Sequence, residues 1–276
     1  MFNARFQLEC RHFDFISCFF DSHRLRACAS VQPVLNILSI ETSSEWCSAA
    51  IWLDGRMLWR EEQAGQRHTE LILPMVDGLL REAAIELGVL DAIAFGAGPG
   101  SFTGLRVACG VAQGLAFAAG VPVAEVSTLL ALAQASGAER VVSCLDARMG
   151  ELYYAAFQRA NEPGSDGQWN TVHAARLCTA ASAPELEGGG WVGVGSGFAA
   201  HGAALAQRYS GRITQVRAEL HPHARDIATL AVEVVREGLA VAAEEARPVY
   251  LRDRVALTVE ERRALKASRA AGAEQP

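Results

Sequence analysis

The sequence lacks the patterns that bind metals, nucleic acids or membranes directly. Its seven cysteines form no CxxC pair and show no zinc-finger spacing. Scattered cysteines in odd number are typical of buried thiols in a reducing compartment, so we expect a cytoplasmic protein. No apolar run approaches the roughly 20 residues of a membrane span, so we expect no membrane contact. The formal net charge is −6, whereas gripping a polyanion requires clustered Lys and Arg. Any nucleic-acid contact is therefore expected to come through a partner.

The common catalytic signatures are also missing. There is no Gly-x-Ser-x-Gly elbow for a nucleophile and no His-x-x-x-His pair to hold a metal ion. His221 and His223 form only a short pair, and His68 stands alone at a predicted helix start, where it reads as a capping or surface residue. Asp146 and Glu151 flank a predicted turn, where exposed acids are common. We expect no catalytic residue, no metal and no cofactor.

The chain divides into a foreign-looking beginning and a body long enough for two domains. Its 276 residues are half hydrophobic, which predicts a folded protein with two medium cores. Residues 1–33 differ, because they carry six phenylalanines and three of the cysteines without a clear period. They are not a convincing signal peptide. We expect a disordered or non-native extension, from a start codon assigned too far upstream, and a fold that begins near Val34.

The body alternates strands with helices. Hydrophobic periodicity predicts a three-strand meander, with Asp54-Gly55 as a hairpin turn, and then helices and strands in alternation. The predicted strands are 34–40, 46–53, 56–63, 91–95, 121–125, 140–146, 151–157 and 191–194. The predicted helices are 66–87, with Pro74 inside it, 104–119, 128–135, 197–207 and 224–237, and residues 159–170 are predicted as a surface loop.

Two similar halves in this order indicate an internally duplicated α/β protein with mixed sheets and flanking helices. We expect a first lobe at 34–136, to which the helix 224–238 returns, and a second lobe at 137–222. The tail 239–276 follows, and from Ala264 onward it is polar, rich in alanine and expected to be loose.

A glycine-rich turn at 96–104 invites comparison with phosphate-binding loops. A P-loop needs Lys and then Ser or Thr after the last glycine, but Leu105 and Arg106 follow here. A dinucleotide fingerprint needs glycine at position 101, which is Ser101. The simplest interpretation is that Ser101 or Thr103 caps the next helix, although a helix start can also hold an anion. The candidate residues for this cap or anion turn are Gly98, Gly100, Ser101 and Thr103.

The helix after this turn consists almost entirely of small residues. Ala108, Ala112 and Ala116 form one stripe, and Gly110 and Gly114 form a neighbouring one. Glycine inside a helix costs about 0.5–1 kcal/mol relative to alanine, so the two glycines require a packing reason. Either a helix of the same chain or a partner helix satisfies it. The strongly apolar preceding helix makes a partner attractive.

Five separate blocks of sequence stand out over roughly residues 34–253. They are Ile37-Leu-Ser-Ile-Glu-Thr-Ser-Ser44, Gln66-Arg-His-Thr-Glu70 with Leu73-Pro74, Gly96 to Arg106, Asp146-Ala-Arg-Met-Gly-Glu-Leu-Tyr-Tyr154 and Pro248-Val-Tyr-Leu-Arg-Asp253. Together these blocks resemble the bacterial TsaB (YeaZ) family. The resemblance implies a two-lobed fold of the actin, Hsp70 and sugar-kinase type.

It also implies a role in placing threonylcarbamoyl on N6 of adenosine 37 in tRNAs that read codons beginning with A. In that family TsaB is the non-catalytic paralogue of TsaD, the metal-bound transferase, and the ATPase TsaE joins them. Where TsaD-like enzymes carry a histidine pair, this chain has Val126-Ser-Thr-Leu-Leu-Ala131, and Glu41-Thr-Ser-Ser44 replaces the phosphate turn Asp-x-Gly-x-Thr. We therefore expect a scaffold or activator of TsaD that meets tRNA only through the complex.

The resemblance places the contact with TsaD on the helices predicted at 66–87 and 104–119. The same surface could make a homodimer when TsaD is absent. The candidate interface residues are Leu71, Ile72, Met75, Leu79, Val107, Gly110, Val111 and Gly114.

Two other functions compete with this one. A small-molecule kinase or ATPase of the same fold would bracket ATP and Mg²⁺ between residues 41–44 and the turn Gly193-Val-Gly-Ser-Gly197. A peptidase is suggested only by an old label of the superfamily, and the missing metal ligands and nucleophile argue against it.

Overall fold

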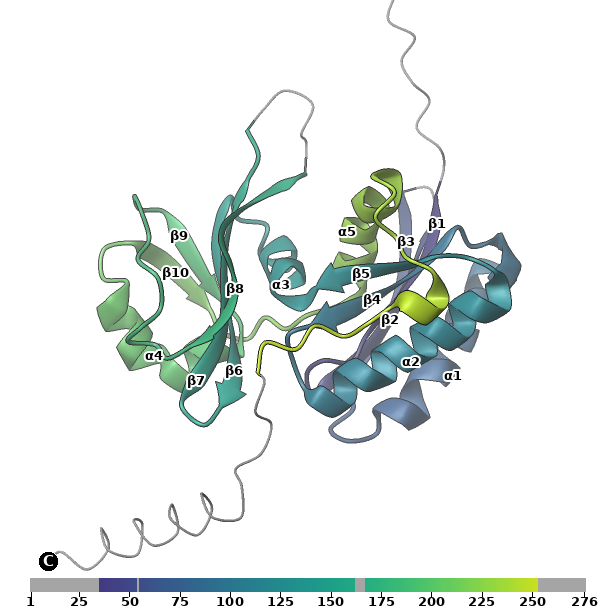
Figure 1. Ribbon diagram of the computed structural model, residues 1–276, viewed down its shortest axis with the longest axis horizontal. Helices are drawn as coiled ribbons and strands as arrows, with labels where there is room; N and C mark the ends of the chain where they lie inside the picture. Colours follow the sequence, from purple (N-terminus) through teal and green to yellow (C-terminus); the bar gives the residue numbers. More distant parts are fainter. Residues whose placement is uncertain (1–34, 54, 162–166, 253–276) are drawn as a thin grey trace, which may run out of the picture. The chain divides into compact units, whose positions relative to one another are not determined.

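The fold is seen in a computed structural model, which describes residues 35–53, 55–161 and 167–252 (Figure 1). The predicted extension 1–33, the residue Asp54 of the hairpin and the loose end of the tail lie outside the described residues. The described chain contains two five-stranded mixed sheets with helices on their faces.

The first sheet has the strand order β3-β2-β1-β4-β5. Its strands are β1 (Asn36–Glu41), β2 (Trp46–Leu53), β3 (Arg56–Gln63), β4 (Ala92–Gly98) and β5 (Val123–Ser127). The first three strands form the predicted antiparallel meander, with Leu53 paired to Arg56 across the hairpin, and β4 and β5 run parallel to β1. The central strands β1 and β4 are buried almost throughout because both faces of the sheet are covered.

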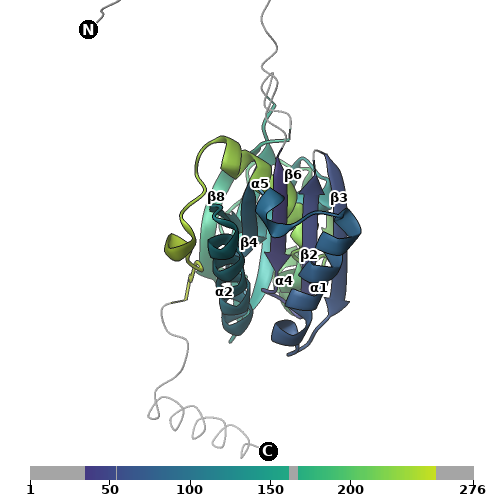
Figure 2. The ribbon, with the colours of Figure 1, turned by 90° about the vertical axis from the view of Figure 1, so that its right-hand side faces the viewer.

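Helices α1 (His68–Ala83) and α2 (Phe102–Ala119) lie side by side on one face of this sheet (Figure 2). Helices α3 (Thr128–Ser136) and α5 (Ala224–Arg236) contact the other face, so the chain returns to the first sheet after the second one is complete. Alternate residues of β1 accordingly enter two different cores: Leu38 and Ile40 face α1 and α2, while Ile37 faces α5.

The second sheet repeats the same plan, with strand order β10-β9-β6-β7-β8. Its strands are β6 (Arg140–Arg148), β7 (Glu151–Arg159), β8 (Trp169–Cys178), β9 (Trp191–Val194) and β10 (Ile213–Arg217), and α4 (Ser196–Arg208) packs on β6 and β9. In both sheets an antiparallel meander of three strands is followed by two parallel strands. The predicted duplicated two-lobed α/β fold is confirmed.

Three local predictions need correction. The predicted helix 66–87 is α1 followed by a separate 3₁₀ turn, η1 (Leu87–Val89), because Ala84 adopts a left-handed conformation that ends α1. The predicted loop 159–170 overlaps the ends of β7 and β8, and β8 and β10 were not expected as strands. Both are edge strands with mainly exposed residues, so neither shows the apolar alternation of a buried strand.

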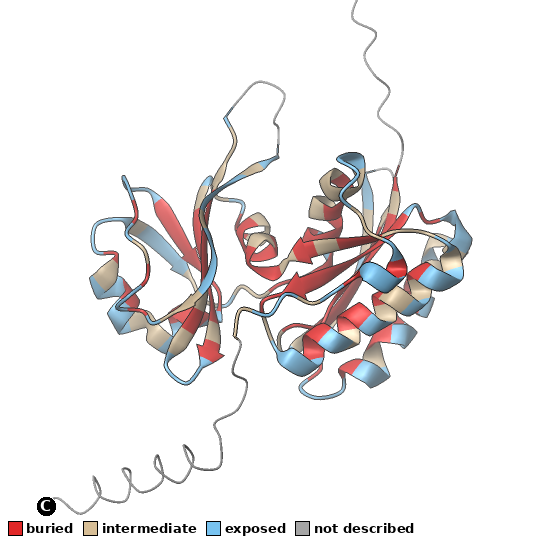
Figure 3. Ribbon diagram, in the orientation of Figure 1, coloured by how far each residue is buried: buried red, intermediate tan, exposed pale blue. Residues whose placement is uncertain are grey.

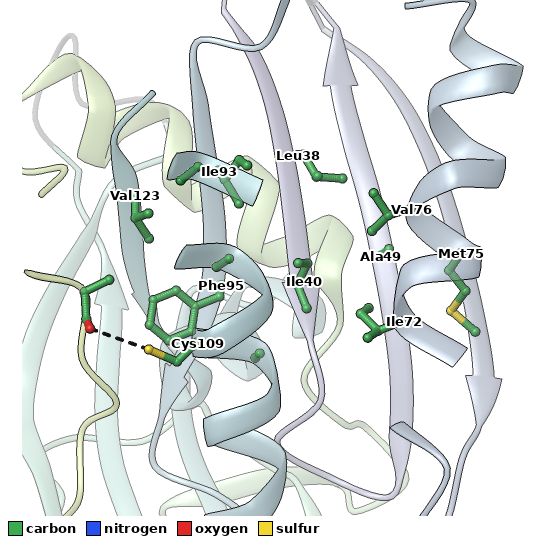
Figure 4. Close-up of a cluster of buried hydrophobic side chains, with 14 of the residues drawn as sticks. Leu38, Ile40, Ala49, Ile72, Met75, Val76, Ile93, Phe95, Cys109 and Val123 are labelled. Atoms are coloured by element: carbon green, nitrogen blue, oxygen red, sulfur yellow. Dashed lines mark hydrogen bonds between the residues drawn. The ribbon is translucent and has the colours of Figure 1, made fainter. Parts of the chain in front are cut away.

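The central strands of the first sheet are buried along much of their length (Figure 3). The core beneath α1 and α2 is built from large side chains of the sheet and small ones of α2 (Figure 4). Ile40, Ile72 and Phe95 are fully buried there. The three alanines of the predicted stripe are fully buried as well, so they let α2 lie close to the sheet. The alanine stripe is therefore explained by packing inside the chain, whereas Gly110 and Gly114 are exposed.

We predict opposite effects for two glycine-to-alanine changes in α2. A Cβ on Gly104 would overlap the carbonyl oxygen of Thr42, so Gly104→Ala should lower the free energy of unfolding by about 1–3 kcal/mol. A Cβ on Gly110 meets no atom within 4 Å, so Gly110→Ala should raise it by about 0.5–1 kcal/mol. Urea unfolding measures both. Equal stability of the two variants would contradict this packing of α2.

Candidate functional site

The turn after β1 is fastened to the glycine-rich turn that opens α2. The Thr42 hydroxyl donates a hydrogen bond to the Gly104 carbonyl oxygen (2.7 Å), and the Ser101 N–H donates to the Ser43 carbonyl oxygen (2.8 Å). A Cβ on Gly100 would lie 2.6 Å from that of Ser43. Glycine is needed at positions 100 and 104 because the two backbones approach each other this closely.

Ser101 is the N-cap residue of α2, and its hydroxyl accepts a hydrogen bond from the Gly104 N–H (3.4 Å). The space beside Gly98 and Gly100 is filled by the chain itself. Gly98 has φ +121°, and a Cβ there would lie 2.7 Å from the carbonyl oxygen of Val249. Thr103 is exposed. The geometry therefore explains Ser101 as a cap and Gly98 and Gly100 as close approaches of the backbone.

Glu41 is a fully buried carboxylic acid beneath this junction. One of its oxygens accepts a hydrogen bond from the Ser43 N–H, and the other has no hydrogen-bond partner among the described residues. Burial raises the pKa of Glu41 from its ordinary 4.5 to about 7, against the opposing effect of the Ser43 hydrogen bonds. A Cβ on Gly96 would overlap the unpartnered oxygen, so glycine there makes room for the carboxyl group.

A cleft of about 1370 Å³ is lined by residues of both sheets. Ser43, Ser101 and Thr103 line one side, and Asp146 and Ser196 line the other. The second predicted turn, 193–197, lies on that other side and is itself tightly packed, because a Cβ on Gly197 would lie 2.7 Å from the Cβ of Cys144.

The two acids that flank the turn between β6 and β7 are each paired with an arginine. Asp146 lies 3.1 Å from Arg148, and Glu151 lies 2.7 Å from Arg252. Asp146 also accepts a hydrogen bond from the Arg148 N–H (2.8 Å). The two carboxylates thus belong to separate ion pairs and do not act together.

The histidines have structural partners. The ring of His221 stacks on Trp46 with centroids 4.7 Å apart, and its Nε2 lies 2.7 Å from Glu61. His223 caps α5, where its Nδ1 accepts from the Arg225 N–H (2.9 Å), and burial lowers its pKa to about 4. An Nδ1 that accepts leaves the proton on Nε2, which then cannot bind a metal. Over the described ranges, no three His, Cys, Asp or Glu side chains are placed to hold a metal ion.

The prediction that His68 is a capping or surface residue is wrong. It is buried in the first turn of α1, and Arg67 occupies the N-cap position. Desolvation lowers the pKa of His68.

The predicted interface residues on α1 and α2 fall into two groups. Ile72, Met75 and Leu79 are buried in the chain's own core beneath the sheet-facing side of α1, so a partner cannot reach their side chains. The other predicted residues are half-buried or exposed and lie on the outward side of the two helices. Three large exposed side chains on these helices were not among the predicted interface residues. The predicted positions that remain on the outward side are Leu71, Val107, Gly110, Val111 and Gly114, and the missed ones are Leu73, Phe102 and Phe117.

Helix α2 is unusually apolar for one that lies on a surface. It is the only helix in the described part of the chain that is long and apolar enough to pass a length-and-composition test for a membrane span, and a third of it is buried. The sequence led us to expect no apolar run that approaches the length of a membrane span. Phe117, whose exposed fraction is 81%, could have been found by plotting all apolar residues of 102–119 on a helix, since it lies outside the alanine stripe.

Two sheets of the same topology, with a cleft between them and helices on both faces, define the duplicated α/β class to which TsaD and YeaZ proteins belong. Residues 61–258 match the family model of TsaD, described as tRNA N6-adenosine threonylcarbamoyltransferase.

Similar proteins of known name identify the family within this class more closely. The tRNA threonylcarbamoyladenosine biosynthesis protein TsaB of Escherichia coli K12 is 40% identical over 233 residues, which cover 80% of this chain and 96% of that protein. TsaB of Haemophilus influenzae is 37% identical over 229 residues, with coverage of 80% and 95%. The solved structure of YeaZ from Pseudomonas aeruginosa is 40% identical, with a TM-score of 0.71 over 79% of this chain and all of that chain. This chain therefore belongs to the TsaB (YeaZ) family.

We predict that Glu41→Gln changes the pH dependence of stability. Between pH 4.5 and about 7 the folded chain holds a proton that the unfolded chain has released, so wild-type stability falls as the pH rises. Glutamine stays neutral, so the variant should gain on the order of 2–3 kcal/mol relative to the wild type between pH 4.5 and pH 8.

Urea unfolding at several pH values measures this difference. Glu45→Gln, at an exposed position of the same turn, serves as the control and should follow the wild-type curve. Parallel curves for Glu41→Gln and the wild type would show that Glu41 is not perturbed in the folded chain.

Proposed function

We propose that this chain acts in tRNA threonylcarbamoyladenosine biosynthesis as a non-catalytic subunit that binds and activates TsaD. In this role TsaD transfers threonylcarbamoyl to N6 of adenosine 37 in tRNAs that read codons beginning with A, and TsaE joins the complex with ATP. The observation that carries the proposal is the exposed apolar side of α2, which lies beside α1; Phe117 on α2 and Leu73 on α1 have exposed fractions of 81% and 49%. The names of the TsaB relatives support the pathway.

The outward side of these helices suits a helical partner. Gly110 and Gly114 lie four residues apart on α2 with open space above them, which lets a second helix approach the backbone of α2 closely. Apolar side chains surround this strip, so docking removes apolar surface from water. When TsaD is absent, the same side can serve a homodimer of this chain.

Non-catalytic status is supported by what occupies the positions of the expected catalytic groups. Residues 128–133 begin α3, where Leu129 and Ala131 are core residues in place of a metal-binding histidine pair. The turn 41–44, which stands in place of a phosphate turn, is packed against α2, and its first residue, Glu41, is fully buried.

The alternative of a kinase or ATPase would place ATP between the turns 41–44 and 193–197. Both turns are packed closely against the chain's own backbone, at Gly104 and at Cys144, which leaves less room beside them for the phosphates of ATP. The geometry therefore favours the subunit. The net charge of −6 favours tRNA contact through the complex. The free cysteines among the described residues favour the cytoplasm.

We predict that Phe117→Glu and Gly114→Leu weaken the complex with TsaD without unfolding the chain. Phe117 is exposed, and a Cβ on Gly114 meets no atom within 4 Å, so both variants should keep wild-type stability or exceed it. The full chain is co-purified with TsaD from the same source, and each dissociation constant is measured by calorimetry. Both variants should bind at least tenfold more weakly, as expected for an apolar anchor lost from an interface.

Val216→Glu is the matched control, since it places the same charge at an exposed apolar position of the second sheet. It should bind TsaD like the wild type and support the same level of tRNA modification in cells that lack the native chain. Failure of the wild type to bind TsaD even with TsaE and ATP present would overturn the proposal, and saturable ATP binding by the isolated chain would favour the kinase alternative.

A further inference from the structure

After the 3₁₀ turn η2 (Ala243–Glu245), residues 246–252 run from the first sheet to the second. We call this segment the strap; it is drawn in yellow in Figure 1. Its residues 249–252 line the cleft described above. None of the contacts of the strap is explained by the proposed docking of TsaD.

On the first sheet the strap is held by α2 and β4. The Val249 N–H donates to the Ala97 carbonyl oxygen (2.7 Å) at the end of β4. The Ala246 carbonyl oxygen accepts hydrogen bonds from the Gln113 amide (3.2 Å) and the Cys109 thiol (3.5 Å), the second of which is the dashed line in Figure 4.

A second group of contacts holds the strap at the start of α2. The Arg106 guanidinium donates to the Tyr250 hydroxyl (3.1 Å) and lies 3.8 Å from the centre of the Phe102 ring. The rings of Phe102 and Tyr250 are 5.2 Å apart, centre to centre.

On the second sheet the strap ends in one well-protected ion pair. Arg252 lies 2.7 Å from Glu151 and donates to the Ala147 carbonyl oxygen (3.0 Å), at the turn between β6 and β7. The side chains of Arg252 and Glu151 are 15% and 32% exposed. In no other arginine–carboxylate pair of the described residues are both partners this buried, so this pair is screened least by solvent.

The glycine-rich turn is shaped to admit the strap. Gly98 has a positive φ that other residues rarely adopt, and any side chain there would meet the carbonyl oxygen of Val249. The glycine at position 98 therefore leaves the space that the strap backbone occupies, and the strap packs closely against the turn.

We propose that the strap is a tie between the two sheets, closed by the Arg252–Glu151 pair, which fixes the cleft and couples it to α2. The coupling part rests on the proposed function. Arg106, Cys109 and Gln113 of α2 hold the strap. Arg106 and Gln113 lie four and three residues from Gly110 on the same helix, so the strap borders the glycine strip offered to TsaD. A partner that orders α2 then also stabilises the strap. By thermodynamic linkage, release of the strap weakens the binding of that partner.

The tie is tested on the free full-length chain by amide hydrogen exchange. Arg252→Met keeps the apolar stem but removes the guanidinium, so the Val249 N–H should exchange at least tenfold faster than in the wild type. Arg252→Lys keeps the charge and should fall between the two. Arg212→Met is the matched control, since Arg212 donates to Gly188 within the second sheet (3.3 Å) and does not contact the strap. Unchanged exchange at Val249 in Arg252→Met would overturn the tie.

The coupling is tested separately by the dissociation constant for TsaD. Arg252→Met should bind TsaD at least threefold more weakly, and Arg212→Met should bind it like the wild type. Faster Val249 exchange together with unchanged TsaD binding would overturn the coupling. Absence of TsaD binding by the wild type would overturn the proposed function and the coupling with it, while the exchange result on the free chain still decides the tie.

Discussion

The close approach of the turn 41–44 to the start of α2 is the constraint on which the rest of this structure depends. It requires glycine at positions 100 and 104 and brings the hydroxyl of Thr42 to the carbonyl oxygen of Gly104. It also closes a small space in which the carboxyl group of Glu41 is buried against Gly96. A longer side chain at any of these glycines would push α2 away from β1 and open the core.

This one junction determines what the two sides of α2 can do. On the inner side, alanines pack on the sheet, and the turn 41–44 is fastened to the start of the helix at Gly104. On the outer side, an apolar helix is left with open space above its glycines. The same packing that argues against nucleotide chemistry thus leaves a surface suited to a partner, and the strap fastens the far end of the chain to this helix.

Much of the fold could be predicted because its signals are local. The meander of β1 to β3, the hairpin at 54–55 and the cap at Ser101 follow from apolar runs, a turn dipeptide and a capping residue. Edge strands β8 and β10 could not, since exposure on the edge of a sheet removes the periodic signal. Which of α1's apolar residues face the sheet depends on packing, so Ile72, Met75 and Leu79 were assigned to a surface they do not reach. The strap could not be predicted either, because it depends on contacts between residues more than 100 positions apart in the chain. Arg252, for example, contacts Glu151 and Ala147.

Amide hydrogen exchange across the whole chain, measured with and without TsaD, is the most direct test of the claim that α1 and α2 form the partner surface. The expected result is slower exchange on TsaD binding in 102–119 and 68–83, with β8 and β10 of the second sheet unchanged. Slower exchange confined to the second sheet, with α1 and α2 unaffected, would contradict it.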